Sequence, residues 1–286
     1  MTKPLISINS LTALLVIAIW QPVLAEQTLN ITDSAHTEDT TMLQDVRFDI
    51  LYDNYPHPQG EVALWGFSCL IRGTEKTILF DAGDLGDSLL ANMTTLGIKP
   101  KDIEQIVISH DHWDHTGGLG RLLPECESPQ VFLLESFSPE LKERVKSMGG
   151  EVVLNSSSRE VCPNVFTTGE MGDQIPEHAL LLRTRGGLIV VTGCAHPGIV
   201  EIVKRAKDLF DDDLLLVMGG FHLLKHSREA TSKIIAEFRD LSVQHVAPTH
   251  CTGDTARQMF KDAYGNDFIG LEVGSTITLS DLLDKQ

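Results

Sequence analysis

The segment with the greatest capacity for chemistry in this chain is residues 109–118, which read Ser-His-Asp-His-Trp-Asp-His-Thr-Gly-Gly. Three histidines and two aspartates fall within the six consecutive positions 110–115, one residue after the apolar run 106–108. Neutral imidazole and carboxylate groups are the ligands that borderline divalent cations such as zinc prefer. The segment therefore predicts a metal site, and a solvated loop that happens to be rich in histidine is the alternative.

The spacing within this segment divides its ligands into two pairs. His110 and His112 are two residues apart and would point to the same side of an extended chain. Asp114 and His115 follow after the chain has turned. One pair can therefore serve each of two adjacent metal ions.

Three more histidines, His196, His222 and His250, each come three or four residues after a predicted strand ends. Loops that leave strand ends on one edge of a sheet can converge in space, and binding sites are commonly built there. The predicted ligand sets are His110, His112 and His196 for one ion, and Asp114, His115 and His250 for the other. We interpret His222 as a metal ligand or a substrate contact, with a structural histidine as the alternative.

The elements that must position these residues repeat in order along the two halves of the chain. Strands are predicted at 47–51, 64–71, 77–80, 105–108, 131–134, 178–183, 188–192, 214–218 and 243–247. Helices are predicted at 87–96, 118–123, 139–148, 199–210 and 227–241. This order predicts an α/β protein with an αββα sandwich, in which two sheets pack face to face and helices cover the outside.

The N-terminus has the pattern of a secretory signal, with a positive charge at Lys3, an apolar run at 11–20 and small residues up to Ala25. We expect cleavage near Ala25 and a periplasmic or secreted protein. A membrane anchor is the alternative, but the polar residues Ser7, Asn9 and Ser10 leave the run short of a membrane span. Residues 26–45 are expected to form a flexible lead-in, and 46–286 the folded domain.

The composition limits the partners of the chain. The formal net charge is −17, which should repel phosphate backbones, so we expect a small-molecule substrate and no nucleic acid. The five cysteines are too few and too scattered for a disulfide scaffold, and their odd number leaves at least one free thiol within a single chain. Cys194 and Cys251 lie beside predicted ligands, and we interpret them as small residues next to metal loops.

Residues 110–115 resemble the signature of the metallo-β-lactamase fold superfamily, with His196 and His250 at its later ligand positions. Asp81 also matches an aspartate of that superfamily that supports the metal ligands. The motifs around residues 193–198, 219–223 and 248–253 resemble the branch that includes the archaeal dihydropterin-aminobenzene-ribofuranosyl-phosphate synthase.

The resemblance implies a binuclear centre with two divalent ions, for which zinc is our first choice and manganese or iron are alternatives. Asp114 would bind metal and orient the attacking water or accept its proton, while Asp111 is expected to support the ligands from behind. Most binuclear members carry an aspartate that bridges both ions. Gly220 stands where we expect that residue, so the bridge is interpreted as missing.

These features favour a secreted metal-dependent hydrolase that uses a metal-bound hydroxide on a small ester, phosphoester, lactone or amide. A pterin-linked transferase is one alternative, and a protein that binds metal or ligand without turnover is another. A periplasmic β-lactam hydrolase suits the predicted location but not the missing bridge. Motifs of serine hydrolases and of nucleotide-binding phosphate loops are absent from the sequence.

Overall fold

The computed structural model describes residues 42–56 and 62–285. The predicted signal segment 1–25 and lead-in residues 26–41 lie outside the described residues. Leu43, which we predicted to belong to the lead-in, is buried and forms a bridge with Thr184. The packed chain therefore includes residues before Val46.

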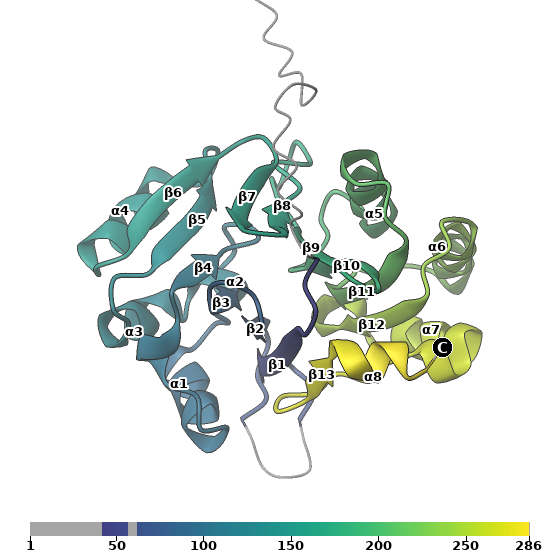
Figure 1. The fold of residues 1–286 in the computed structure, drawn as a ribbon, viewed down its shortest axis with the longest axis horizontal. Helices are drawn as coiled ribbons and strands as arrows, with labels where there is room; N and C mark the ends of the chain where they lie inside the picture. Colours follow the sequence, from purple (N-terminus) through teal and green to yellow (C-terminus); the bar gives the residue numbers. More distant parts are fainter. Residues whose placement is uncertain (1–41, 57–61, 286) are drawn as a thin grey trace, which may run out of the picture. The chain divides into compact units, whose positions relative to one another are not determined.

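Two sheets form the centre of the fold (Figure 1). The first has the strand order β13-β1-β2-β3-β4-β5-β6, and the second has the order β12-β11-β10-β9-β8-β7. The strands of the first sheet are β1 Arg47–Tyr52, β2 Ser68–Arg72, β3 Ile78–Phe80, β4 Gln105–Val107, β5 Gln130–Leu134, β6 Glu151–Asn155 and β13 Thr276–Thr278. Those of the second are β7 Arg159–Cys162, β8 Val165–Thr167, β9 Leu180–Thr184, β10 Gly187–Thr192, β11 Leu214–Gly220 and β12 His245–Thr249.

Helices cover the outer face of each sheet (Figure 1). On the first sheet these are α1 Gly86–Thr95, α3 Leu119–Leu122 and α4 Pro139–Ser147, and on the second they are α5 Ile199–Leu209, α6 Arg228–Asp240 and α7 Asp254–Tyr264. The short helix α2 Trp113–Thr116 lies in the loop after β4, and α8 Leu279–Leu283 follows β13 and buries Leu279 and Leu282 in the core between the sheets. Side chains alternate between the faces of each strand, so Ile78 and Phe80 of β3 lie in the core between the sheets, while Leu79 packs with the helices α1, α3 and α4. The αββα prediction is confirmed.

Several elements were not predicted from the sequence. These are β6, β7, β8, β13, α2, α7 and α8. The strand predicted at 64–71 forms only from Ser68 onward, as β2. The three-residue strand β13 shows why: it is too short for a periodic pattern, and pairing with β1, more than 200 residues earlier, makes it a strand.

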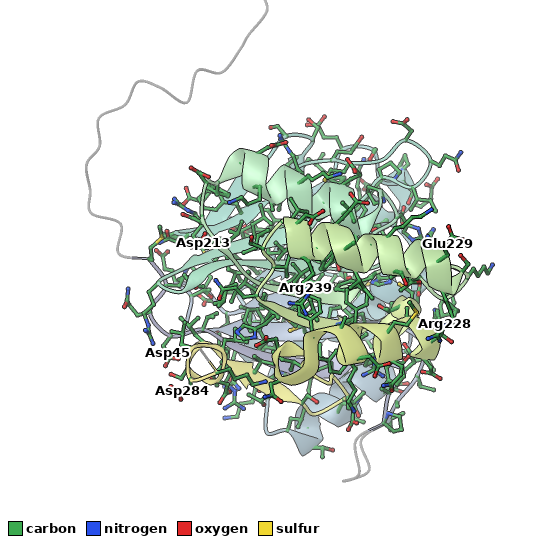
Figure 2. All side chains as sticks on the ribbon, turned by 90° about the vertical axis from the view of Figure 1, so that its right-hand side faces the viewer. Asp45, Asp213, Arg228, Glu229, Arg239 and Asp284 are labelled. Atoms are coloured by element: carbon green, nitrogen blue, oxygen red, sulfur yellow. The ribbon has the colours of Figure 1, made fainter. Side chains whose placement is uncertain are left out.

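The outer helices carry charged side chains, as Figure 2 shows for Arg228 and Glu229 at the start of α6. Arg239, near the end of α6, lies 4.0 Å from the ring centroid of Tyr264 on α7 and so joins the two helices. Within the described ranges, no helix combines the length and the hydropathy that a membrane crossing needs.

Parallel pairing aligns the ends of the strands that carry the site. Strand β3 is parallel to β4, and β11 is parallel to both β10 and β12. The carboxyl ends of parallel neighbours meet at the same edge of a sheet. Loops that follow these five strands are therefore gathered at one edge of each sheet.

Candidate metal centre

The His-rich loop leaves β4 and turns into the short helix α2. His112 still has extended backbone angles (φ −107°, ψ 151°), whereas Asp114 and His115 lie in the single turn of α2. The chain thus changes direction between the two predicted ligand pairs. His115 is fully buried and Asp114 nearly so.

The first predicted ligand set, His110, His112 and His196, comes together. His110 Nε2 lies 3.1 Å from His112 Nδ1. The ring of His196 has its centroid 4.7 Å from that of His110 and 4.9 Å from that of His112. His196 arrives from the loop after β10, in the opposite sheet.

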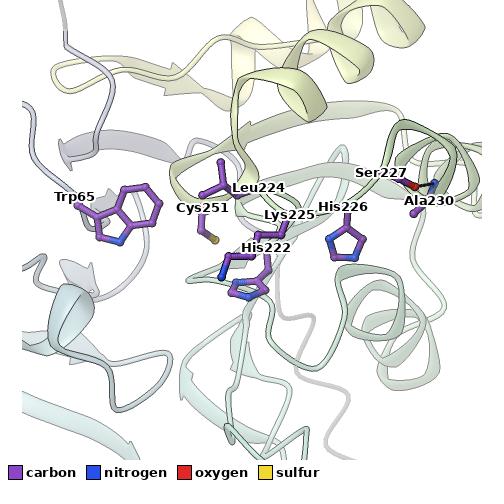
Figure 3. A pocket seen from close by; sticks show the side chains of 8 residues that line it. All are labelled: Trp65, His222, Leu224, Lys225, His226, Ser227, Ala230 and Cys251. Atoms are coloured by element: carbon purple, nitrogen blue, oxygen red, sulfur yellow. Dashed lines mark hydrogen bonds between the residues drawn. The ribbon is translucent and has the colours of Figure 1, made fainter.

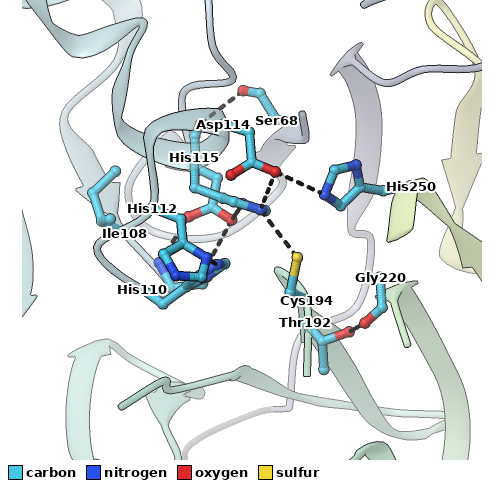
Figure 4. A network of polar contacts seen from close by, with 12 residues as sticks. Ser68, Ile108, His110, His112, Asp114, His115, Thr192, Cys194, Gly220 and His250 are labelled. Carbon is cyan, nitrogen blue, oxygen red and sulfur yellow. Dashed lines mark hydrogen bonds and ion pairs between the residues drawn. The ribbon is translucent and has the colours of Figure 1, made fainter. Parts of the chain in front are cut away.

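The second predicted set, Asp114, His115 and His250, also comes together (Figure 4). Asp114 Oδ2 lies 3.6 Å from His115 Nε2 and 3.4 Å from His250 Nε2. His250 begins the short 3₁₀ turn His250–Thr252 that follows β12. It has a positive φ of 48°, which turns this residue out of the direction of the strand.

Cys194 lies beside both sets, which sequence reasoning did not predict. Its Sγ is 3.3 Å from His115 Nε2 (Figure 4). It lies within 4.8 Å of the ligand atoms of His110 and His196, and also within 4.8 Å of those of Asp114 and His250. Gly220 itself offers no ligand, and Cys194 supplies a donor atom that neither predicted set included.

Gly220 has no room for a carboxylate. A Cβ built there would lie 2.3 Å from the carbonyl oxygen of Gly193 and 2.7 Å from Cys251 Sγ. The loop that follows β10 carries Cys194 beside both ligand sets.

Asp81 orients one histidine of each set. Its Oδ2 accepts a hydrogen bond from His115 Nδ1 (2.7 Å), so Nε2 of that ring faces the centre. Asp81 also accepts from the hydroxyl of Ser109 (2.8 Å), which contacts His110 Nδ1 at 2.9 Å. Such contacts fix ring orientation and raise ligand basicity. Asp111 instead accepts from the backbone N–H of Ser138 and holds the loop to the start of α4.

Three further residues support the predicted metal ligands and were not predicted from the sequence. Asn54 Oδ1 lies 2.9 Å from His250 Nδ1, and Trp65 Nε1 donates to Asp114 Oδ2 at 2.9 Å. Glu177 is fully buried, and its carboxylate accepts hydrogen bonds from three consecutive backbone N–H groups, those of residues 194, 195 and 196, at 2.9, 2.8 and 2.8 Å. A Glu followed by a strand is too common a pattern to have marked this role.

The geometry of the second set fits a metal ion. A tetrahedral zinc ion with bonds of about 2.0–2.3 Å separates its ligand atoms by roughly 3.3–3.7 Å. The distances of His115 Nε2 from Cys194 Sγ and of Asp114 Oδ2 from the two histidine Nε2 atoms, 3.3 to 3.6 Å, lie in this range. Among the described residues, the buried Nε2 atoms of His196 and His250 have no hydrogen-bond partner. Buried polar atoms normally have one, so both are available as ligands.

Electrostatics also suit a cation. Burial and neighbouring imidazoles lower the pKa of His196 to about 3 and hold that of His110 well below its usual range, so both rings are neutral. Burial acts to lower the pKa of His115 too, but Asp81 and Asp114 outweigh it and raise this pKa to about 9. Without a metal, His115 is therefore protonated and supplies the positive charge next to Asp114, and a divalent ion bound at Nε2 would replace the proton there.

The same forces act on the remaining ligands. Burial opposes ionisation of Asp114, but His250 and His115 outweigh it and lower the pKa of this carboxyl. Contact with the Cys251 thiol and burial raise the pKa of Cys194 well above its usual range. The Cys194 thiol is thus protonated until an ion binds, and a coordinated thiol loses its proton. All five cysteines are free of disulfide bonds.

A cavity of about 550 Å³ opens beside the centre (Figure 3). Its walls include Trp65, Leu224, Lys225, His226 and Cys251. The exposed His222 lines it as well, with its ring centroid 4.3 Å from that of His196. A pocket of this size next to candidate ligands is the expected place for a substrate, so the position of His222 favours substrate contact.

The fold and the centre define a metallo-β-lactamase-type protein, and the sequence comparisons agree. A model of the metallo-beta-lactamase superfamily matches residues 66–131. The 7,8-dihydropterin-6-methyl-4-(beta-D-ribofuranosyl)-aminobenzene-5'-phosphate synthase of Methanocaldococcus jannaschii is 31% identical over 261 residues, covering 74% of this chain and 89% of the synthase. The chain therefore belongs to the metallo-β-lactamase superfamily.

Solved structures show the same relationship. Tm1679, a metal-dependent hydrolase of the beta-lactamase superfamily, has a TM-score of 0.69 and 29% identity, covering 81% of this chain and 98% of its own. YhfI from Bacillus subtilis, a metallo-beta-lactamase fold protein, has a TM-score of 0.60 at 11% identity, covering 82% and 99%. At this low identity, the match to YhfI supports the fold and nothing more.

Proposed function

We propose that this chain is an exported metal-dependent hydrolase with two divalent ions, zinc in the first place, that acts on a small ester, phosphoester, lactone or amide. The observation that carries the proposal is the convergence of two ligand sets, centred on His110 and on His115, beside one cavity. Export rests on the sequence of residues 1–25.

When bound, the ions would polarise a carbonyl or phosphoryl oxygen of the substrate and lower the pKa of water toward about 7. Hydrolysis joins the water oxygen to the acyl carbon or phosphorus, breaks the bond to the leaving group and moves a water proton onto that group. Asp114 Oδ2 faces the centre between His115 and His250, where it can orient the water and accept its proton. Trp65 holds this carboxylate in place.

The cavity indicates the kind of substrate. Trp65 and Leu224 offer exposed apolar surface, whereas Lys225 and His226 offer nitrogen groups that can contact an anion. A molecule with a planar or apolar body and an anionic group fits this arrangement. We place the scissile bond at the centre and the body of the substrate against Trp65.

A pterin-linked transfer is the second candidate. It is supported by the 31% identity to the Methanocaldococcus jannaschii synthase, whose name describes a dihydropterin joined to a 5'-phosphate. The aromatic wall at Trp65 suits a pterin ring, and the metal centre would serve this reaction as well as hydrolysis. A protein that binds metal or ligand without turnover is the third candidate.

Metal content and turnover test these alternatives. The purified protein, loaded with zinc, is analysed for metal and assayed against a phosphodiester, a phosphomonoester, a lactone and a β-lactam. His112→Ala is compared with His245→Gln, since His245 is buried at the start of β12 and lies outside both ligand sets. We expect about two ions per chain, and loss of turnover in His112→Ala alone.

The other outcomes favour the other candidates. Bound metal without hydrolysis of any substrate, combined with product formation from a pterin precursor, would support transfer. Bound metal with neither reaction would support a binding protein. Absence of metal from the wild-type protein would contradict all metal-dependent functions.

A further inference from the structure

The position of Cys194 is unusual among the five cysteines because its sulfur lies close to both ligand sets. Its side chain is 4% exposed, and its Sγ is 3.3 Å from His115 Nε2. The same sulfur lies within 4.8 Å of the ligand atoms of His110 and His196 on one side, and of Asp114 and His250 on the other. No other residue in the described part of the chain belongs to both of these groups.

The backbone fixes the sulfur in this place. Glu177 holds the N–H groups of residues 194, 195 and 196 through its buried carboxylate. Ala195 has a positive φ of 61°, a conformation uncommon for a residue with a side chain, and it separates Cys194 from His196. Position 193 must be glycine, because a Cβ there would lie 2.0 Å from Ser109 Oγ. Three separate restraints therefore set this loop.

We propose that the thiolate of Cys194 bridges the two metal ions, in the place that a carboxylate would occupy. The proposal rests on the proposed function for the presence of two ions. With the bridge, each ion has four protein ligands: one is held by three imidazoles and sulfur, the other by two imidazoles, one carboxylate and sulfur. Sulfur is a soft donor, so this centre selects zinc or iron over manganese and magnesium.

Cys251 is the natural control because it is the thiol nearest to Cys194. Its Sγ donates to the carbonyl oxygen of Cys194 at 3.6 Å. Among the described residues, Cys251 belongs to one group of possible metal ligands, with Cys194 and His222, and to neither of the groups that contain His110 or Asp114. Loss of the Cys251 thiol should therefore leave the ligands of both ions unchanged.

Cadmium-113 NMR tests the bridge, because it reports each ion separately and needs no turnover. The metal-free protein is loaded with two equivalents of ¹¹³Cd. The wild type should give two resonances, both in the downfield range of sulfur-ligated cadmium. Cys251→Ser should give the same pair. Cys194→Asp should keep two ions, with both resonances in the upfield range of nitrogen and oxygen ligands.

Any other pattern of ¹¹³Cd resonances contradicts a bridging Cys194 thiolate. Two wild-type resonances in the nitrogen and oxygen range would exclude sulfur ligation, and one downfield resonance would show a ligand to a single ion. If Cys194→Asp does not fold, Cys194→Ser and the wild-type spectrum still decide. If the wild type binds two ions and hydrolyses substrate but gives no downfield resonance, the bridging role of Cys194 is contradicted and the hydrolase function is supported. Failure to bind cadmium or zinc would contradict both.

Discussion

Glu177→Gln is the substitution that tests most directly how the centre is held. The two carboxylate oxygens of Glu177 accept from three backbone N–H groups, two on Oε1 and one, from His196, on Oε2. Glutamine has almost the same shape but only one acceptor oxygen. In its best orientation it keeps the bonds to residues 194 and 195 and turns its NH₂ group toward the N–H of His196. Two donors then face each other in a buried place.

The energetic cost of Glu177→Gln follows from the hydrogen bond that is lost and from the backbone donor that is left without a partner. A hydrogen bond to a charged group contributes about 1.5–3 kcal/mol, and a buried donor without a partner costs about 1–3 kcal/mol. Because these contributions overlap, we expect the free energy of unfolding to fall by about 2–4 kcal/mol. The loop carries Cys194 and His196, so metal affinity should fall by about 10–100-fold, as for other residues that orient ligands.

Urea unfolding of the metal-free protein at pH 7 measures the first effect, and zinc competition with a chelator measures the second. Glu170→Gln is the matched control, since Glu170 lies on the same segment but is exposed. A change in unfolding free energy below about 0.5 kcal/mol for Glu177→Gln, the size typical of a surface substitution, would refute this reasoning.

Three further predictions concern pH, metal and the carboxylate at the centre. Burial lowers the pKa of His178 from 6.5 to about 4. Between these two pH values the unfolded state therefore binds one proton more than the folded state. The free energy of unfolding should fall by up to about 3 kcal/mol as the pH drops through this window. His178→Gln should reduce the slope of unfolding free energy against pH by about one proton, and an unchanged slope in urea titrations would argue against this cause. Chelation should lower the Tm and zinc should restore it, since only the folded chain assembles the ligands; a Tm insensitive to both would contradict the site. Trp65→Phe keeps a ring in the cavity but removes the bond to Asp114, so kcat/KM should fall about fivefold, equivalent to about 1 kcal/mol, and an unchanged value would show that this bond does not matter.

Most of the fold was predictable because its signals are local. Helix α1 and strands β3, β4 and β10 have strong apolar patterns and formed within a few residues of their predicted bounds. Short or exposed elements were not predictable. Strand β6, for example, has a mostly exposed or half-buried pattern and becomes a strand through its pairing with β5.

The sequence by itself determined which chemical groups are available and roughly where strands end. The dense segment at 110–115 indicated metal ligands, because few other roles need so many imidazoles together. The position of His196 and His250 just after predicted strand ends also predicted that they would approach this segment, as the structure places them.

Tertiary structure alone decided which groups complete the centre. Asn54 meets His250 across 196 residues, and Cys194 meets His115 across 79. Such contacts depend on the packing of two sheets and on angstrom-scale distances, whereas a sequence pattern records only residue type and separation along one chain. The place of Cys194 beside both ligand sets, and the role of Glu177 in holding three N–H groups of the same loop, therefore became visible only in the folded structure.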